Sequence, residues 1–262
     1  MERIWDTLNR EICLDVEIIC TGECLFRVVA TDDKPNSKYA ERTIKVDGYR
    51  KIYLSFPVTP KQMKIKVDCL KSASIEKNFI VNVSERKLTK YDVFFDQNTK
   101  DFLPLAIYFS QVAGFENASV NGRLFRTKDG KFTIKYFPQI VDYKSGAILS
   151  TPARIGHRTG IIEDSKKAFD KYTVAMRMII NLHEFSHVYK NPKMGLNISN
   201  EIGADINALY IYLGLGFSKV DAIYVFANVF LKAQTPQNIQ RMSKIMEYIK
   251  RFENEEYAKI IK

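Results

Sequence analysis

The spacing of hydrophobic and polar residues changes about a third of the way along the chain. In the first 95 residues apolar side chains alternate with polar ones, as in Ile12–Ile18, and this period of two is typical of strands. Asp47-Gly48 lies between two such runs and predicts a hairpin. The pattern favours a small β-sandwich-like domain over residues 1–95. Its short strands are expected at residues 12–18, 24–30, 43–46, 51–56, 63–69 and 79–83.

Beyond residue 95 a helical period of three to four residues becomes prominent. Thr235 before Pro236 is a strong signal for the start of the last helix, because proline is favoured at the first helical position. We therefore expect an α+β protein whose second domain, residues 96–262, ends in helices. The expected helices cover residues 101–112, 165–189, 199–213, 218–232 and 235–252, and the third of them is expected to end at Gly214 and Gly216. The expected strands cover 122–127, 131–137 and 147–155, and the first two are expected to form a hairpin through Lys128-Asp129-Gly130.

The long helix expected at 165–189 contains His183-Glu184-Phe185-Ser186-His187, which is the pattern HExxH. An α-helix has 3.6 residues per turn, so residues four apart share a face. Both imidazoles can therefore bind one metal ion, with Glu184 beside them to move a proton. An apolar stripe along the same helix indicates that it packs into a core.

A catalytic zinc site usually has three protein ligands and one water molecule, so a third ligand is needed. Ser199 is a plausible N-cap for the next helix, which begins Glu201-Ile202-Gly203-Ala204-Asp205. Glu201 and Asp205 again share one face, and two adjacent helices could bring that face onto the histidines. The natural assignment gives Glu201 the third ligand position and lets Asp205 accept the distal N–H of His183. Spacing alone also permits Asp205 as the ligand.

HExxH followed on a later helix by Glu-x-x-Ala-Asp resembles the glutamate-zincin (gluzincin) metallopeptidases. The short gap between the two helices is also similar to the ImmA/IrrE-type zincins of bacteria and their mobile elements. The resemblance, which covers residues 145–215, implies zinc ligands at His183, His187 and Glu201, a general base at Glu184 and an orienting carboxylate at Asp205. It also implies that a strand before the HExxH helix lies along the cleft, so that residues 148–154 are expected to pair with substrate.

A zincin also needs a group that stabilises the oxyanion formed opposite the metal. His157 lies in a loop just before the HExxH helix and is one candidate, although an isolated loop histidine is often an ordinary surface residue. Tyr189, Tyr210 and Tyr212 are weaker candidates, because their positions on the helices place them away from the motif or facing elsewhere.

Composition narrows the classes of function. The chain carries 40 Lys and Arg against 30 Asp and Glu, a net charge of +10, but the basic residues are dispersed without an arginine-rich tract, which argues against a nucleic-acid binder. No apolar run reaches the roughly 18 residues of a membrane span, and residues 1–6 lack the apolar core of a secretion signal. Cysteines at 13, 20, 24 and 69 are interpreted as core thiols, so a cytoplasmic location is expected.

The sequence therefore predicts a Zn²⁺-dependent peptidase that hydrolyses peptide bonds of a protein or peptide substrate, with Glu184 as general base. The alternative is a catalytically silent zincin-fold protein with a structural or binding role. A composition rich in Lys, Ile, Asn and Tyr is typical of AT-rich genomes, such as those of phages or low-GC bacteria. A structural or binding component of a phage particle is one form of this alternative. In either case the N-terminal β domain is a candidate for binding a protein partner.

Overall fold

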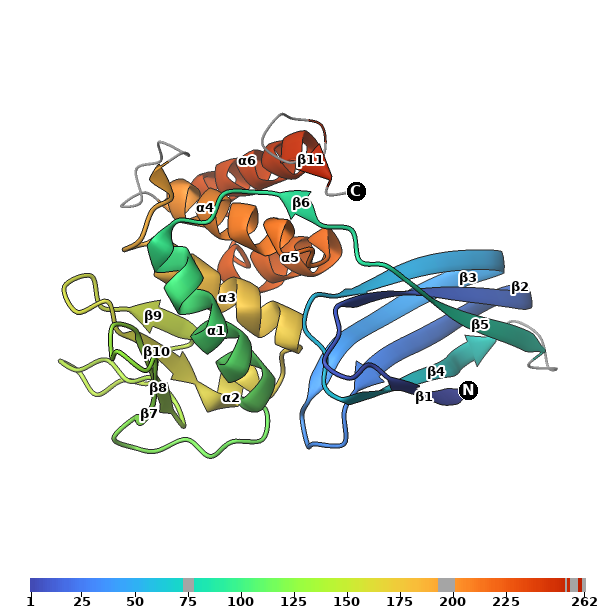
Figure 1. Cartoon of the computed structure of the whole chain (residues 1–262), viewed down its shortest axis with the longest axis horizontal. Coiled ribbons are helices and arrows are strands. Elements are labelled where there is room, and N and C mark those ends of the chain that lie inside the picture. Colours follow the sequence, from blue (N-terminus) through green and yellow to red (C-terminus); the bar gives the residue numbers. More distant parts are fainter. Residues whose placement is uncertain (73–77, 193–200, 253, 255–258, 261–262) are drawn as a thin grey trace. The chain divides into compact units, whose positions relative to one another are not determined.

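The computed structural model describes residues 1–72, 78–192, 201–252, 254 and 259–260 (Figure 1). It confirms an α+β protein in which an antiparallel sheet comes first and all the helices among the described residues follow it. None of the helices described combines the length and the apolar character that crossing a membrane requires.

The first 89 residues contain one five-stranded antiparallel sheet with β2 at its centre. β2 pairs with β3 along one edge, whereas its other edge pairs first with β5 and then with β4, which is flanked by β1. Alternate residues of β2, including Leu14, Val16 and Phe26, are buried, and this is the period that the sequence shows. The strands are β1 (Glu2–Asp6), β2 (Ile12–Thr31), β3 (Lys38–Phe56), β4 (Gln62–Ser72) and β5 (Phe79–Arg86).

The hairpin predicted at Asp47-Gly48 is wrong, because both residues lie inside β3. Gly48 has a φ of +73° and Gly22 in β2 has a φ of +75°, and both lie where the pairing register between the two strands shifts. A glycine in this left-handed region makes a β-bulge as readily as a hairpin turn. The short strands expected at 12–18 and 24–30 are consequently parts of β2, and those at 43–46 and 51–56 are parts of β3.

A second, four-stranded sheet precedes the central helix of the remaining chain. Its order is β7 (Arg123–Arg126), β8 (Thr133–Phe137), β10 (Ile162–Ser165) and β9 (Ala153–Ile155). β7 and β8 form the expected antiparallel pair, whereas β8 and β10 run parallel. β10 was not predicted, and β9 is shorter than the strand expected at 147–155. β9 lies at one edge of this sheet and pairs with β10 alone among the strands described.

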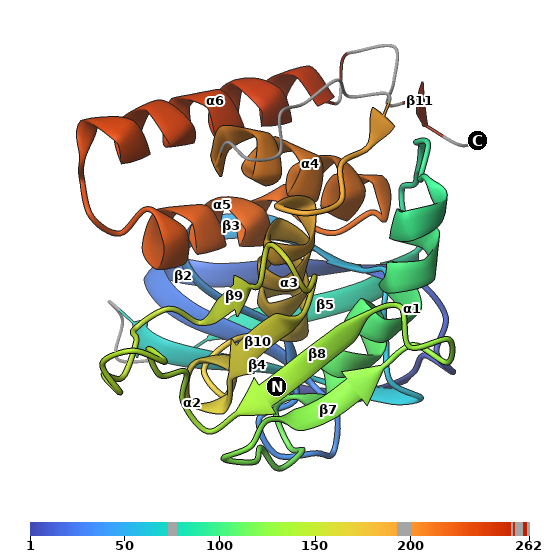
Figure 2. The same ribbon diagram turned by 90° about the vertical axis from the view of Figure 1, so that its left-hand side faces the viewer.

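Helix α3 (Val174–Ser186) occupies the middle of this region, and every one of its residues is buried (Figure 2). It contacts β9 and β10 as well as α1, α4 and α5, so its position is fixed from several sides. The other helices are α1 (Gln97–Val112), α2 (Lys166–Phe169), α4 (Glu201–Gly214), α5 (Lys219–Val225), the π-helix η2 (Phe226–Phe230) and α6 (Pro236–Phe252). The short strands β6 (Tyr91–Asp92) and β11 (Lys259–Ile260) pair with each other.

The single helix predicted over residues 165–189 is wrong, because the chain forms α2, a turn and then α3. Thr173 caps α3 by accepting the backbone N–H of Met176 at 3.2 Å. The buried Arg177 donates its Nε–H to the carbonyl oxygen of Phe169 at 2.9 Å, which occupies a carbonyl at the end of α2. α4 ends at Gly214 and α6 begins at Pro236, as the sequence predicts. The predicted N-cap Ser199 lies outside the described residues.

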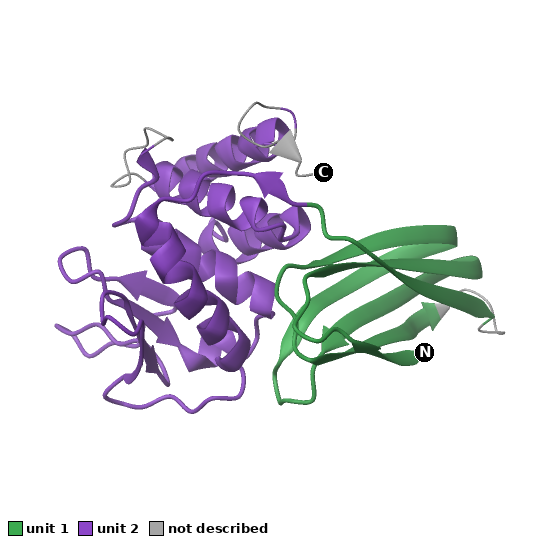
Figure 3. Cartoon of the chain, viewed as in Figure 1, with its two compact units in different colours: residues 1–89 green, residues 90–262 purple. Residues whose placement is uncertain are grey.

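The chain folds into two compact units, residues 1–89 and 90–262 (Figure 3). The boundary expected from the sequence lies at residue 95, close to this division. β6 belongs to the second unit, where it pairs with β11 near the end of the chain.

Candidate metal centre

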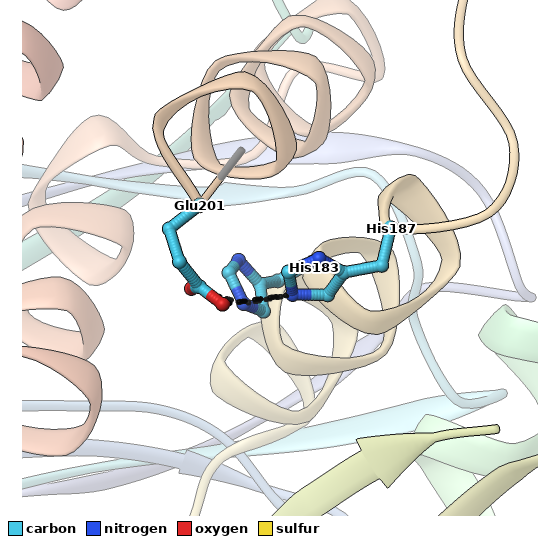
Figure 4. Close-up of side chains that lie close together, drawn as sticks. All are labelled: His183, His187 and Glu201. Carbon is cyan, nitrogen blue, oxygen red and sulfur yellow. Dashed lines mark hydrogen bonds and ion pairs between the residues drawn. The ribbon is translucent and has the colours of Figure 1, made fainter. Parts of the chain in front are cut away.

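Two helices of the second unit bring three potential metal ligands together (Figure 4). His183 lies in the last turn of α3, His187 is the residue that caps this helix, and Glu201 begins α4. The Nε2 atoms of the two histidines are 3.1 Å apart. Oε2 of Glu201 lies 3.7 Å from Nε2 of His183, and Oε1 of Glu201 lies 3.6 Å from Nε2 of His187. One potential ligand atom from each of the three residues therefore lies within 4.8 Å of the other two.

The separations suit a zinc ion. Zinc binds imidazole nitrogen or carboxylate oxygen at about 2.0–2.2 Å in a tetrahedral arrangement, so adjacent ligand atoms should lie about 3.3–3.5 Å apart. The separations in the structure are 3.1 Å between the two nitrogens and 3.6 and 3.7 Å from these nitrogens to the two oxygens of Glu201, which is close to that value. Two nitrogen donors and one oxygen donor also form the set that catalytic zinc sites use, with the fourth position left for water.

Asp205 holds His183 from the opposite side of the imidazole ring. The buried Asp205 carboxylate lies 2.9 Å from Nδ1 of His183, so Nε2 of the same ring faces His187 and Glu201. Burial alone would lower the pKa of His183, but the hydrogen bond and charge of Asp205 outweigh it and raise that pKa. Of the two assignments left open by spacing, this geometry favours Glu201 as ligand and Asp205 as the orienting carboxylate.

Arg241 of α6 contacts both carboxylates of α4, and it is not among the site residues that the sequence predicts. Its Nε and Nη2 atoms donate to the two oxygens of Asp205 at 2.8 and 2.9 Å, and Nη2 also lies 3.0 Å from Glu201. A buried carboxylate needs such a partner, so a cation near Asp205 is expected on physical grounds. Nothing in the sequence singles out this arginine among the chain's many basic residues.

Glu184 lies beside the three ligands without joining them. Its carboxylate is buried and accepts a hydrogen bond from the backbone N–H of Ile155 in β9. Burial and the charge of Glu201 raise the pKa of Glu184 to about 6, although His183 and the Ile155 N–H act in the opposite direction. A carboxyl group with a pKa close to neutrality is suited to accepting and returning a proton.

A cavity of about 400 Å³ opens onto these side chains. His157 is exposed and lines it, and the centre of its ring lies 5.9 Å from that of His187. Phe230, in the π-helix η2, covers His183 with a ring-to-ring distance of 4.4 Å. The cavity is lined by Thr151, Arg154, Ile155, His157, His183, Glu184, His187, Glu201, Phe230 and Arg241.

The three tyrosines considered for the oxyanion do not line this cavity. Tyr210 accepts a hydrogen bond from the backbone N–H of Phe94 at 2.8 Å, and the ring of Tyr189 stacks on Phe185. Tyr212 is fully buried. Among the sequence candidates for the oxyanion, only His157 reaches the space next to the proposed ligands.

Asp164 is a second buried carboxyl group near Glu184, and no motif in the sequence distinguishes it from other acidic residues. It lies in β10 with no exposed surface, and neither of its oxygens has a hydrogen-bond partner among the described residues. Burial raises the pKa of Asp164 well above its usual range, and the charges of Glu184 and Glu163 add to the effect. Burial therefore favours the neutral, protonated form of this group over the charged form.

Comparisons of the chain with protein-family models, with curated proteins and with solved structures give no match. The resemblance to gluzincins consequently stays a prediction from two short motifs. What supports a metal centre independently of it is the geometry of His183, His187 and Glu201.

Proposed function

We propose that this protein is a zinc-dependent peptidase. The observation that carries the proposal is the convergence of His183, His187 and Glu201 beside a buried Glu184 that is not itself one of the converging ligands. A site that only held a metal for structural reasons would normally have four protein ligands and no need for a neighbouring proton acceptor. Three ligands, a nearby base and an accessible cavity are the components that metal-assisted hydrolysis requires.

In this proposal the side chains divide the work of peptide hydrolysis. A bound zinc ion would polarise the peptide carbonyl and activate the attacking water. Glu184 accepts a proton from that water and returns it to the nitrogen of the leaving amine. Asp205 fixes the orientation of His183, and Arg241 fixes both carboxylates of α4.

The substrate backbone is proposed to bind along β9. This strand is an edge strand, and an extended peptide can add to such an edge through main-chain hydrogen bonds. The backbone N–H of Ile155 in β9 donates a hydrogen bond to the Glu184 carboxylate. A peptide on this edge would therefore lie beside the proposed base. His157, which lines the same cavity, is proposed to stabilise the oxyanion.

The test is a comparison of wild-type protein with the Glu184→Gln variant. Glutamine has nearly the same shape but cannot accept the proton, so we expect zinc to be retained and hydrolysis of denatured proteins to fall by about 10²–10⁴-fold. Zinc content is measured on the purified proteins by elemental analysis, and a chelator should abolish wild-type cleavage. Equal cleavage by the two proteins would contradict the proposed role of Glu184.

A binding protein without catalytic activity is the second candidate. It is favoured by three apolar residues that are cross-strand neighbours in the first unit and are all exposed: Ile19, Tyr49 and Ile80. Such a surface is typical of contacts with another protein. This candidate predicts bound zinc without hydrolysis in the experiment above.

A cytoplasmic setting is proposed for either function. All four cysteines lie in the described residues and none of them forms a disulfide, which fits a reducing compartment. Fractionation of the source cells would test this location directly.

A further inference from the structure

A second cavity lies next to the one that opens onto the metal centre. Its volume is about 340 Å³, and Thr151 lines both cavities, so the two are neighbours along residues 148–155. One side of the second cavity is formed by residues 148–151, just before the edge strand β9, and another by α2 and the turn after it. A peptide bound along β9 would therefore continue into this second cavity.

The second cavity carries positive charge that nothing in the described residues balances. Lys167 and Lys171 line it, both are exposed, and neither has an ion-pair partner within the described part of the chain. None of the described residues that line this cavity carries a carboxylate. Lys166 on the same short helix differs, because it pairs with Asp170 at 2.8 Å and does not line the cavity.

The cationic groups of the first cavity are already occupied. Arg154 pairs with Glu163 at 2.7 Å, and Arg241 is held by Asp205 and Glu201. Of the lysines and arginines that line the two cavities, only Lys167 and Lys171 lack an ion-pair partner among the described residues. Ser150, Thr151 and Ser165 add hydroxyl groups there, which can also donate to an anionic oxygen.

We infer that the second cavity binds side-chain carboxylates of the substrate, so that the protein acts on acidic peptide segments. This inference rests on the proposed peptidase function, because it extends the same groove. Lys167 on α2 and Lys171 in the turn after it line the same cavity, so they can contact one carboxylate or two carboxylates of an extended chain. The lysines are exposed, so each contact should change affinity only severalfold, and salt should weaken it.

The experiment measures binding with the full-length Glu184→Gln variant, so that no peptide is consumed. The probes are a fluorescein-labelled peptide rich in glutamate and a twin in which every glutamate is glutamine, and the readout is fluorescence anisotropy. We expect the glutamate peptide to bind about tenfold more tightly than its twin. The preference should disappear when Lys167→Glu and Lys171→Glu are combined in this protein.

The matched control combines Lys100→Glu and Lys128→Glu, which change the net charge equally. Both lysines are exposed and neither lines either cavity, so the preference for the glutamate peptide should survive. Thermal unfolding of each variant confirms that it is folded. Equal binding of the two peptides to the Glu184→Gln protein, or an equal loss in the control variant, would overturn the inference.

Two further measurements distinguish an acidic peptide from a nucleic acid as the ligand, and this inference from the proposed peptidase function. A single-stranded oligonucleotide of similar net charge that bound more tightly than the glutamate peptide, and through the same two lysines, would overturn the assignment to a peptide. The peptide binding is measured without hydrolysis and is repeated without added zinc. A preference for acidic peptides combined with no cleavage by wild-type protein would therefore reject the peptidase and keep the acidic ligand, whereas cleavage without the preference would do the reverse.

Discussion

Arg241 shows how much of the proposed centre depends on one side chain from a distant helix. Its forked guanidinium contacts both oxygens of Asp205 and one oxygen of Glu201, a geometry that a lysine ammonium group cannot reproduce. Because Arg241→Lys keeps the positive charge and loses the fork, we expect zinc affinity to fall by about 10-fold. Competition with a chromophoric chelator measures that affinity.

The control for this prediction lies on the same helix. Arg251 of α6 is exposed and lies 3.9 Å from Glu247, away from the proposed ligands, so Arg251→Lys should leave zinc affinity unchanged. If a folded Arg241→Lys protein bound zinc as tightly as wild type, Arg241 would not position the ligands.

Asp164 allows a residue-scale prediction about stability and pH. Its pKa in the folded protein lies well above the ordinary value of 3.8, so the folded state keeps a proton that the unfolded state releases as the pH rises. This group therefore costs stability above pH 4, whereas the amide introduced by Asp164→Asn does not titrate. Relative to wild type, the variant should gain unfolding free energy as the pH rises from 4 to 7, by at most about 1.4 kcal/mol per pH unit.

Urea denaturation of both proteins across this pH range measures the difference. Asp142 provides the opposite case, because hydrogen bonds from the backbone N–H groups of Ser145 and Lys144 lower its pKa. Relative to wild type, the Asp142→Asn variant should therefore lose stability as the pH rises toward 4, where the unfolded carboxyl group ionises, and the difference should change little from pH 5 to 7. A gain for Asp164→Asn that did not change with pH would show that Asp164 is not a buried acid with a raised pKa.

At the scale of elements, the features that the sequence predicts best are those determined by neighbouring residues in the chain. Four-residue spacing placed His183 and His187 on one face of a helix, and a Thr-Pro pair located the start of α6. The hairpin of β7 and β8 was also predicted, because its turn residues lie between two apolar runs. These features depend on residues within a few positions of each other.

Elements that depend on distant contacts were missed. β10 has only four residues, two of them acidic, and it forms a strand because it pairs with both β8 and β9. The break between α2 and α3 contains no glycine or proline, so the helical pattern continues through it, and Thr173 becomes a cap only in the folded chain. Arg241 lies 36 residues beyond its partner Asp205, so sequence proximity gave no indication that it belongs to the centre.

At the scale of the whole molecule, the donors of the proposed zinc site all lie in the second unit, residues 90–262. A ligand that binds only the folded state stabilises it by RT ln(1 + [L]/Kd), which is about 2.7 kcal/mol at a concentration of 100 times Kd. Zinc should therefore slow amide hydrogen exchange in α3 and α4 but leave β2 and β3 unchanged. Hydrogen exchange followed by mass spectrometry, with and without zinc, measures both regions in one experiment, and a His187→Ala variant serves as the control because it lacks one of the three ligands. Equal slowing in β2 and β3 would show that the first unit also responds to zinc, which a site built from α3 and α4 alone does not explain.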